Sequence, residues 1–316
     1  MRKRHKKGQN IGLRFMVFVL LAVLVISYTY TIAPNITDGQ PEATVTPTPV
    51  IITPDSDSTI KLAAFNIQVF GVTKANKPEV MEVLSKIIRN YDIVAVQEIR
   101  DASQTALPAL VNAVNAMGGS QYDYVVGERL GRTVSKEQYA YIYNNQTIEL
   151  IGSPYTFPDP SDIFHREPYI ANFKARDGNF DFVLITLHSD PNTATQEIND
   201  LPIVVNYTKS QFHDEGDFII LGDLNADCNY FKEDGPSPLR SDEYYWVINN
   251  SVDTTTKPTD CTYDRIIITA PAIPDFTGDS GAFRFDEAYN LTYEHTIAVS
   301  DHYPVYATFW SNRDTD

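Results

Sequence analysis

Cysteine is scarce in this chain of 316 residues, which limits the covalent cross-links available to its fold. Only two cysteines occur, Cys228 and Cys261, so a single intramolecular pairing exists. A bridge between them would indicate an oxidising compartment. It would stabilise the fold by roughly 3–4 kcal/mol, because it restricts the unfolded chain. Two buried free thiols are the alternative.

Basic residues are also in short supply. The chain has 25 lysines and arginines against 41 aspartates and glutamates, a net charge of −16. Six of the basic residues precede position 15, so positions 15–316 contain 19 basic and 41 acidic residues, a net charge of −22. Generic polyanion binders are basic, so this composition alone argues against nucleic acid, unless divalent cations occupy acidic sites and the contact surface is locally basic.

Acidic residues are absent before Asp38, and this first part of the chain predicts export. Positions 1–14 are basic, and positions 15–33 form an apolar run that would rise roughly 28 Å as a helix, close to the ~30 Å hydrocarbon thickness of a bilayer. The run predicts either a retained signal anchor, which is a transmembrane helix, or a cleaved signal peptide. The sequence around Ala33 and Pro34 is a poor cleavage site, which favours the anchor.

Aromatic residues are missing from positions 34–58, where proline and threonine are frequent. Such a segment cannot bury a core and predicts an extended linker. Positions 59–312 follow without a second linker or an internal repeat, so we expect one domain. Because the basic positions 1–14 stay cytoplasmic, this domain is expected outside the cell, membrane-anchored or otherwise secreted.

Short apolar runs predict many strands and few helices. Strands are expected at 61–66, 93–97, 122–128, 139–143, 148–151, 169–174, 182–188, 218–222, 265–269 and 305–309. Helices are expected at 78–89, 102–117 and 194–212, the last broken in the middle by Pro202. Positions 122–151 contain three strands and no helix, which argues against a doubly wound parallel sheet. The pattern predicts an α+β fold, a two-layer β-sandwich flanked by helices.

Polar motifs fall where these strands end. They are Phe65-Asn66, Gln97-Glu98, His188-Ser189, 222–227 (GDLNAD), 263–265 (YDR) and 300–304 (SDHYP). Strand ends in a packed sheet converge, so these residues can form one site that holds a hard metal ion and two histidines. That inventory suits phosphodiester hydrolysis.

Carboxylates and amides in these motifs suit a magnesium ion or a scissile phosphate. Asp223 and Asn225 lie two positions apart, so in an extended segment both side chains point to the same side. The alternative is an Asx-rich turn that closes a strand. Glu98 and Asn66 could equally be a solvated strand end and a turn, but together with Asp301 they offer the few oxygen ligands that magnesium accepts while keeping its waters.

Histidine is rare as well, with six in the chain. His188 and His302 both lie at ends of apolar strands, where they could act as base and acid around an in-line attack on phosphorus. Each needs a carboxylate to fix its tautomer, and Glu137 and Asp264 are the candidates. A lone histidine is more often structural, whereas a pair with nearby acids favours catalysis.

In order along the chain, these motifs resemble the pancreatic-type deoxyribonuclease I family of the endonuclease/exonuclease/phosphatase superfamily. The resemblance runs from Lys61 to about Phe309. The stretches specific to the deoxyribonuclease branch are 64–67 (AFNI), 97–101 (QEIRD), 130–132 (LGR), 136–137 (KE), 166–168 (REP), 187–189 (LHS), 226–230 (ADCNY) and 261–265 (CTYDR).

The resemblance implies a DNase I-like fold, a four-layer α/β-sandwich with two packed, mainly antiparallel sheets flanked by helices. It also implies a monomer that uses Mg²⁺ (or Mn²⁺) and Ca²⁺ to hydrolyse double-stranded DNA, with low sequence specificity, to 5′-phosphorylated products. A superfamily phosphodiesterase acting on a lipid or inositol phosphate is the main alternative. A catalytically silent adhesion protein would lack a histidine or metal ligand, and none is missing.

The family's functional residues carry over position by position. Its catalytic pairs match His188 with Glu137 and His302 with Asp264. Its metal and phosphate groups match Asn66, Glu98, Asp223, Asn225 and Asp301. Its DNA-contacting residues match Arg100, Arg166, Tyr230 and Tyr263, and its essential disulfide matches Cys228 and Cys261.

Two structural calcium sites are implied in the same way. Asp159, Asp162, Phe164 (through its carbonyl) and Glu167 resemble the first, and Asp253, Thr255 and Thr259 resemble the second. Lys257 stands where the family has another threonine, which we expect to weaken the second site.

Further departures from the family concern the grip on DNA. Ser135 replaces a tyrosine that packs in the minor groove, Gln68 replaces an arginine, and the small extra disulfide near 158–163 is missing. None of these changes removes catalytic machinery.

Overall fold

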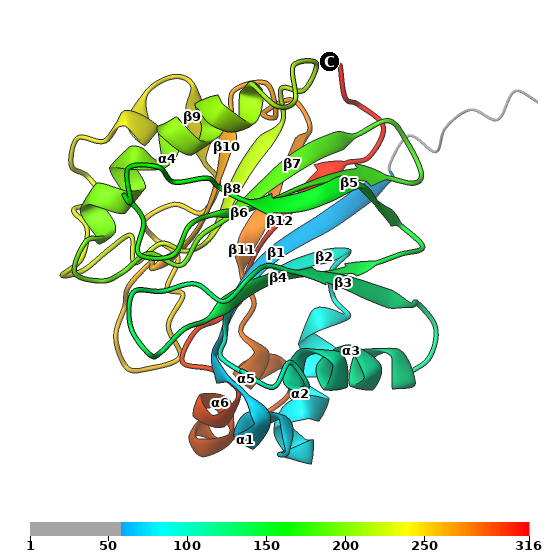
Figure 1. The fold of residues 1–316 in the computed structure, drawn as a ribbon. Helices are drawn as coiled ribbons and strands as arrows, with labels where there is room; N and C mark the ends of the chain where they lie inside the picture. Colours follow the sequence, from blue (N-terminus) through cyan, green and yellow to red (C-terminus); the bar gives the residue numbers. More distant parts are fainter. Residues whose placement is uncertain (1–57, 316) are drawn as a thin grey trace, which may run out of the picture. The chain divides into compact units, whose positions relative to one another are not determined.

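The computed structural model describes residues 58–315, which form two packed six-stranded sheets with helices outside them (Figure 1). The first sheet has the strand order β11-β12-β1-β2-β4-β3, and the second has the order β5-β6-β7-β8-β10-β9. Only β1 with β2 and β7 with β8 pair in parallel among these strands. The predicted four-layer α/β-sandwich with mainly antiparallel sheets is confirmed.

The strands of the first sheet are β1 (Thr59–Phe70), β2 (Ile93–Ile99), β3 (Tyr122–Val126), β4 (Gln138–Asn144), β11 (Phe276–Ala282) and β12 (Val305–Trp310). Those of the second are β5 (Ile148–Thr156), β6 (Tyr169–Ala175), β7 (Asp181–Thr186), β8 (Phe218–Asp223), β9 (Tyr244–Trp246) and β10 (Asp264–Thr269). The helices are α1 (Val72–Ala75), α2 (Pro78–Ile88), α3 (Ala106–Ala116), α4 (Ala194–Lys209), α5 (Phe285–Ala288) and α6 (Tyr293–Val299), with one 3₁₀ turn, η1 (Pro238–Arg240).

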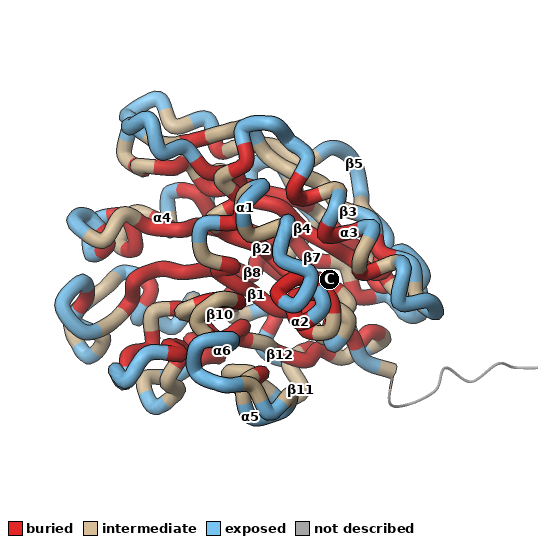
Figure 2. Tube along the Cα trace, turned by 90° about the horizontal axis from the view of Figure 1, so that it is seen from below, coloured by how far each residue is buried: buried red, intermediate tan, exposed pale blue. Residues whose placement is uncertain are grey.

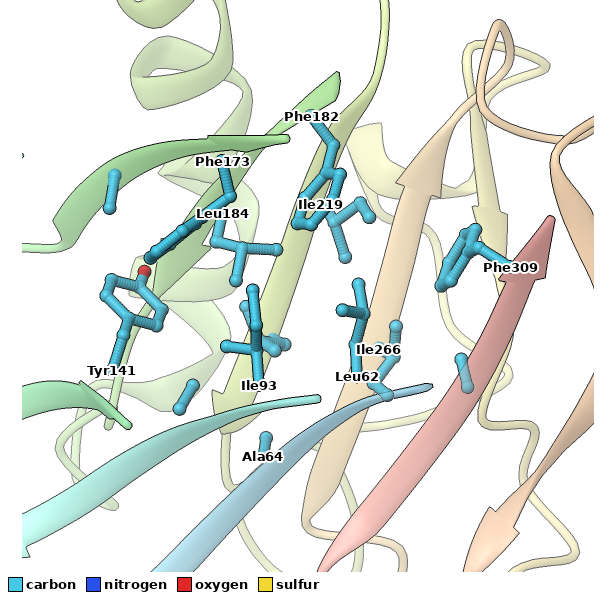
Figure 3. Packing of buried hydrophobic residues seen from close by; sticks show 14 of the residues in the cluster. Leu62, Ala64, Ile93, Tyr141, Phe173, Phe182, Leu184, Ile219, Ile266 and Phe309 are labelled. Atoms are coloured by element: carbon cyan, nitrogen blue, oxygen red, sulfur yellow. The ribbon is translucent and has the colours of Figure 1, made fainter. Parts of the chain in front are cut away.

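Three apolar layers hold this sandwich together. Side chains such as Leu62, Ile93, Phe173 and Ile266 fill the space between the sheets (Figure 3). A second layer joins the first sheet to α2 and α3, and a third joins the second sheet to α4. Buried residues follow the strands, whereas exposed residues gather in the connections (Figure 2). Burial of apolar surface is therefore the main stabilising contribution to the fold.

Pro202 does not break its helix, contrary to expectation. Helix α4 continues from Ala194 to Lys209 with Pro202 inside it. A proline in a helix interior removes one hydrogen bond and costs about 3 kcal/mol. Around it, Leu201, Val204 and Val205 are fully buried against the second sheet. Their burial, at roughly 1.5–3 kcal/mol for each side chain, offsets that cost.

The predicted basic segment 1–14 and apolar segment 15–33 lie outside the described residues, as does nearly all of the predicted linker 34–58. Within residues 58–315, we find no helix whose length and apolar character would let it cross a membrane.

Candidate active site

Strand direction brings the polar motifs to one edge of the sandwich. The parallel strands β1 and β2 carry Asn66 and Glu98 toward their carboxyl ends, and β12 and β4 begin at this edge because they run antiparallel to them. In the second sheet, Asp223 at the end of β8 pairs with Asp264 at the start of β10. The site therefore draws on both sheets.

Two histidine–carboxylate pairs face one aspartate oxygen at this edge. His188 Nδ1 lies 3.0 Å from Glu137 Oε1, and His302 Nδ1 lies 2.8 Å from Asp264 Oδ2. The Nε2 atoms of His188 and His302 lie 3.4 and 3.6 Å from the same atom, Asp223 Oδ2. Both imidazoles thus turn one nitrogen to a buried carboxylate and the other toward a shared point.

Burial and charge shift the pKa values of these groups. Burial raises the pKa of Asp264 to about 6, although His302 opposes the rise. Burial lowers the pKa of His302, but the carboxylates of Asp264 and Asp223 outweigh it and raise the value to about 10. The carboxylates of Glu137 and Asp223 likewise raise the pKa of His188 against the effect of burial. His302 is therefore protonated at neutral pH, as a proton donor must be.

A strained turn orients Glu98. Glu98 has a φ of 61° within a register shift of β2, and Gln68 and Val69 have φ values of 40° and 49°. The Val69 N–H donates to Glu98 Oε2 at 2.8 Å, and the Gln68 N–H donates to Asn66 Oδ1 at 2.9 Å. A left-handed conformation is costly for a β-branched residue such as Val69, so the surrounding contacts must maintain it.

Oxygen ligands in this region fit a hard divalent cation. The Asn66 amide donates to Asp223 Oδ2 at 2.9 Å and to Glu98 Oε1 at 3.2 Å, which gathers one carboxylate of the first sheet and one of the second around a single amide. Two groups could hold a metal, because their ligand atoms lie within 4.8 Å of one another: Glu98, Glu137 and His188, and Asp223, Asp264 and His302. Carboxylate oxygens are the ligands that Mg²⁺ prefers.

Asp223 and Asn225 do not lie in an extended segment. Strand β8 ends at Asp223, and Asn225 has a φ of 49°. The Asn225 N–H donates to Asp223 Oδ1 at 3.0 Å, and the Asn225 amide donates to the Ser189 carbonyl at 3.1 Å. The motif is therefore an Asx turn, and it leaves Asp223 Oδ2 to face the two histidines.

Lys74 is a component of the site that the sequence did not suggest. Its ammonium donates to the carbonyls of Ile67, Gln68 and Val299 at 3.0, 2.6 and 2.9 Å. Burial lowers the pKa of Lys74 to about 8, against the nearby carboxylates of Asp301 and Glu98. Lys74 thereby joins the strained segment near the end of β1 to the end of α6, just before Asp301.

Comparison with known proteins agrees with this geometry. Residues 63–302 match the Endonuclease/Exonuclease/phosphatase family. Deoxyribonuclease-1 of Bos taurus is 35% identical over 260 residues, which cover 79% of this chain and 92% of that protein. The chain belongs to the deoxyribonuclease I family. Deoxyribonuclease gamma of Mus musculus is 34% identical over 267 residues, 80% of this chain and 86% of that protein.

A solved structure of low sequence identity has the same fold. It is an endonuclease/exonuclease/phosphatase family protein from Bacteroides thetaiotaomicron, with a TM-score of 0.54 at 15% identity over 80% of this chain and 95% of that chain. At this identity the likeness extends to the fold alone.

Within this deoxyribonuclease I family member, the two arginines expected at DNA occupy different environments. Arg100 is partly exposed, with Nη2 3.0 Å from Glu98 Oε2, and its Nη1 donates to Ser135 Oγ at 3.3 Å. Arg166 is buried: its Nε lies 2.5 Å from Glu137 Oε1 and donates to the His188 carbonyl at 2.9 Å. Arg166 therefore contacts the His188–Glu137 pair in this structure rather than presenting its charge to the surface.

The tyrosines of the DNA-binding prediction lie together at the rim of the site. Tyr230 and Tyr263 have ring centroids 5.6 Å apart, and Tyr263 lies 6.3 Å from the His302 ring. The predicted disulfide is confirmed, since Cys228 is bonded to Cys261. The bridge holds the loop of Tyr230 next to Tyr263, which directly precedes β10, and it rules out two free thiols.

In the first predicted calcium site, the Arg132 guanidinium contacts two of the expected ligands. One Asp159 oxygen accepts the Phe164 N–H at 2.8 Å, and the other is buried without a hydrogen-bond partner among the described residues. The carbonyl of Phe164 and the side chain of Asp162 both accept from Arg132 Nη2, at 3.1 and 2.9 Å. Glu167 is half-buried nearby in sequence. The oxygen donors suit calcium, which would compete with this guanidinium.

The second predicted calcium site is a compact group of oxygens. Thr255 Oγ1 lies 2.9 Å from Asp253 Oδ1, 2.9 Å from the Thr259 carbonyl and 3.0 Å from Thr259 Oγ1. The Lys257 side chain points away from these oxygens, and its ammonium donates to Asp301 Oδ2 at 2.7 Å. We expected Lys257 to weaken this site. Its ammonium lies at Asp301, so any weakening does not come from direct contact between the ammonium and these oxygens.

Proposed function

We propose that the protein is an exported endonuclease that hydrolyses double-stranded DNA with low sequence specificity to 5′-phosphorylated products. The observation that carries the proposal is the convergence of two histidine–carboxylate pairs on Asp223 Oδ2. A phosphate placed between the two Nε2 atoms would have one imidazole on the side of the attacking water and the other on the side of the leaving oxygen. The names of the relatives support DNA as the substrate.

The site residues divide the reaction between them. In this proposal His188, oriented by Glu137, accepts the proton of the attacking water. His302, kept protonated by Asp264, donates a proton to the departing 3′ oxygen as the phosphorus–oxygen bond breaks. The water oxygen remains on the 5′ phosphate, and a 3′ hydroxyl leaves.

Glu98, Asn66 and Asp301 would hold a divalent cation, Mg²⁺ or Mn²⁺, which would stabilise negative charge on the phosphate. Calcium would occupy the two oxygen groups at 159–167 and 253–259 and would reduce the negative charge of the chain near its substrate. Arg100, Tyr230 and Tyr263 would contact DNA. We include export in the proposal because the Cys228–Cys261 bridge suits an oxidising compartment and because residues 1–33 resemble a signal or anchor.

Nicking of supercoiled plasmid by the full-length protein tests this function. We expect nicking with Mg²⁺ and Ca²⁺, none with EDTA, and a loss of at least about 100-fold in His188→Ala. His213→Ala, which changes an exposed histidine in the loop before β8, is the matched control and should nick like the wild type. An intact plasmid combined with hydrolysis of a lipid or inositol phosphodiester would replace this proposal with the alternative substrate class.

A further inference from the structure

Lys257 is fixed next to the catalytic segment by its neighbours. The Thr256 N–H donates to the Asp301 carbonyl at 3.0 Å, and Thr256 Oγ1 donates to the Ser300 carbonyl at 2.9 Å. Thr255 forms a β-bridge with His302. Residues on both sides of this contact are buried, so the backbone of Lys257 is held against the segment that carries Asp301 and His302.

From this position the Lys257 ammonium pairs with Asp301. The distance from Nζ to Asp301 Oδ2 is 2.7 Å, and the side chains are 52% and 16% exposed. The hydrogen bond to Asp301 raises the pKa of Lys257, and the nearby Tyr293 and Tyr230 add to the rise. The lysine is thus a protonated, half-exposed group at the mouth of the site, beside a tyrosine of the expected DNA surface.

The opposite side of the site has a similar arrangement. Glu98 Oε2 is paired with Arg100 Nη2 at 3.0 Å. Glu98 and Asp301, the two carboxylates proposed to hold the divalent cation, are therefore each paired with a cationic side chain. The Lys257 ammonium, 2.7 Å from Asp301, repels a divalent ion that approaches the same carboxylate. This repulsion is strong because Asp301 is largely shielded from water.

We propose that Lys257 is a cation that exchanges at Asp301: it competes with the divalent ion for this carboxylate in the free enzyme and contacts a phosphate of the DNA backbone in the complex. The proposal rests on the proposed function, because it takes Asp301 as a metal group and DNA as the substrate. The half-exposed, flexible side chain of Lys257 can leave Asp301 when the ion binds. The released ammonium then lies where a polyanion approaches a chain that is acidic overall.

The two roles predict opposite effects of one substitution. In Lys257→Met, which removes the charge without adding an oxygen ligand, the protein should bind Mn²⁺ about three- to tenfold more tightly without DNA, because a competing charge is gone. With Mn²⁺ present and turnover blocked by His188→Ala in both proteins, it should bind duplex DNA about three- to tenfold more weakly. The slope of log affinity against log salt should fall by about one, since one phosphate contact is lost.

Calorimetry with Mn²⁺ and fluorescence anisotropy with a labelled duplex measure these effects without turnover. Lys86→Met is the matched control, because Lys86 is also a surface lysine paired with a carboxylate, Glu82, at 2.6 Å, but on α2. It should leave both affinities unchanged. Lys257→Arg keeps the charge and should retain the salt slope of the wild type. Thermal melting establishes that each variant is folded.

Mn²⁺ affinity that is unchanged or lower in a folded Lys257→Met protein would overturn the competition, and an unchanged salt slope would overturn the phosphate contact. If the wild-type protein nicks plasmid and the variant gives either of those results, this inference alone is refuted. Wild-type protein that neither nicks plasmid nor binds the duplex refutes the proposed function instead.

Discussion

His302 Nδ1 lies 2.8 Å from Asp264 Oδ2, although the two residues are 38 positions apart. Asp264 begins β10 of the second sheet, whereas His302 lies just before β12 of the first. Asp264 is fully buried, and its carboxylate is the largest of the influences that raise the pKa of His302. The pair turns Nε2 of the imidazole toward Asp223, and the raised pKa keeps the ring protonated. This relationship connects the packing of the two sheets to the proposed proton donor.

Replacing Asp264 with asparagine keeps the shape of the side chain and removes its charge. We expect turnover to fall by about 10²- to 10⁴-fold. The pKa of His302 is raised by Asp264, so its loss should lower that pKa. Because a proton donor is active below its pKa, the alkaline limb of the pH–rate profile should move to lower pH. A profile that keeps its wild-type alkaline limb would contradict the role of His302.

Arg166→Ala tests whether this arginine contacts DNA or supports the catalytic pair. Its guanidinium is buried against Glu137 and the His188 carbonyl, so its loss leaves Glu137 with less compensation for its buried charge. We expect kcat to fall at least tenfold, with little change in KM for DNA and a lower thermal midpoint. Steady-state kinetics separates the two roles, since a direct DNA contact would appear mainly as a higher KM.

Lys74→Met should disturb the metal site through the strained turn. Three carbonyls lose their donor, and the turn that holds Glu98 loses its link to α6. We expect the Mg²⁺ concentration for half-maximal activity to rise about three- to tenfold. Hydrogen bonds from a charged donor contribute about 1.5–3 kcal/mol each, so stability should also fall by a few kcal/mol.

Lys74 also predicts a pH effect, because burial lowers its pKa to about 8. Above this pH the ammonium loses a proton and one of its three contacts, so wild-type activity should decline from about pH 8 upward, and Lys74→Met should lack this decline. Lys86→Met, at a half-exposed lysine on α2, is the control and should behave like the wild type. Equal Mg²⁺ requirements in all three proteins would remove Lys74 from the site.

Reduction of Cys228–Cys261 should destabilise the protein. The bridge closes a loop with a sequence separation of 33, and loop-closure entropy predicts a loss of roughly 3–4 kcal/mol. Urea unfolding with and without reductant measures the change, and the Cys228→Ser, Cys261→Ser double variant should match the reduced protein and be insensitive to reductant. Identical midpoints for oxidised and reduced wild-type protein would argue against a stabilising bridge.

The sequence by itself determined much of the fold, because buried strands can be predicted from apolar runs. Strands β2, β8 and β10 follow such runs, and α2 follows an apolar stripe at helical spacing. Strand β11 escaped prediction since its residues are mostly polar and half-exposed, and α4 continues through Pro202 because tertiary burial outweighs a local preference. Local signals predict an element only where burial along the chain is regular.

The composition of the candidate site was also legible in the chain, since motifs of acids, amides and histidines mark the ends of strands. Only the tertiary structure decided how those groups are used: that Asp223 lies between two histidines, that Arg166 is buried behind Glu137, and that two lysines enter the site. Lys74 and Val299 are 225 positions apart, and Lys257 and Asp301 are 44 apart. Such contacts depend on which strand edges meet when the sheets pack, and no short-range pattern in a sequence encodes that meeting.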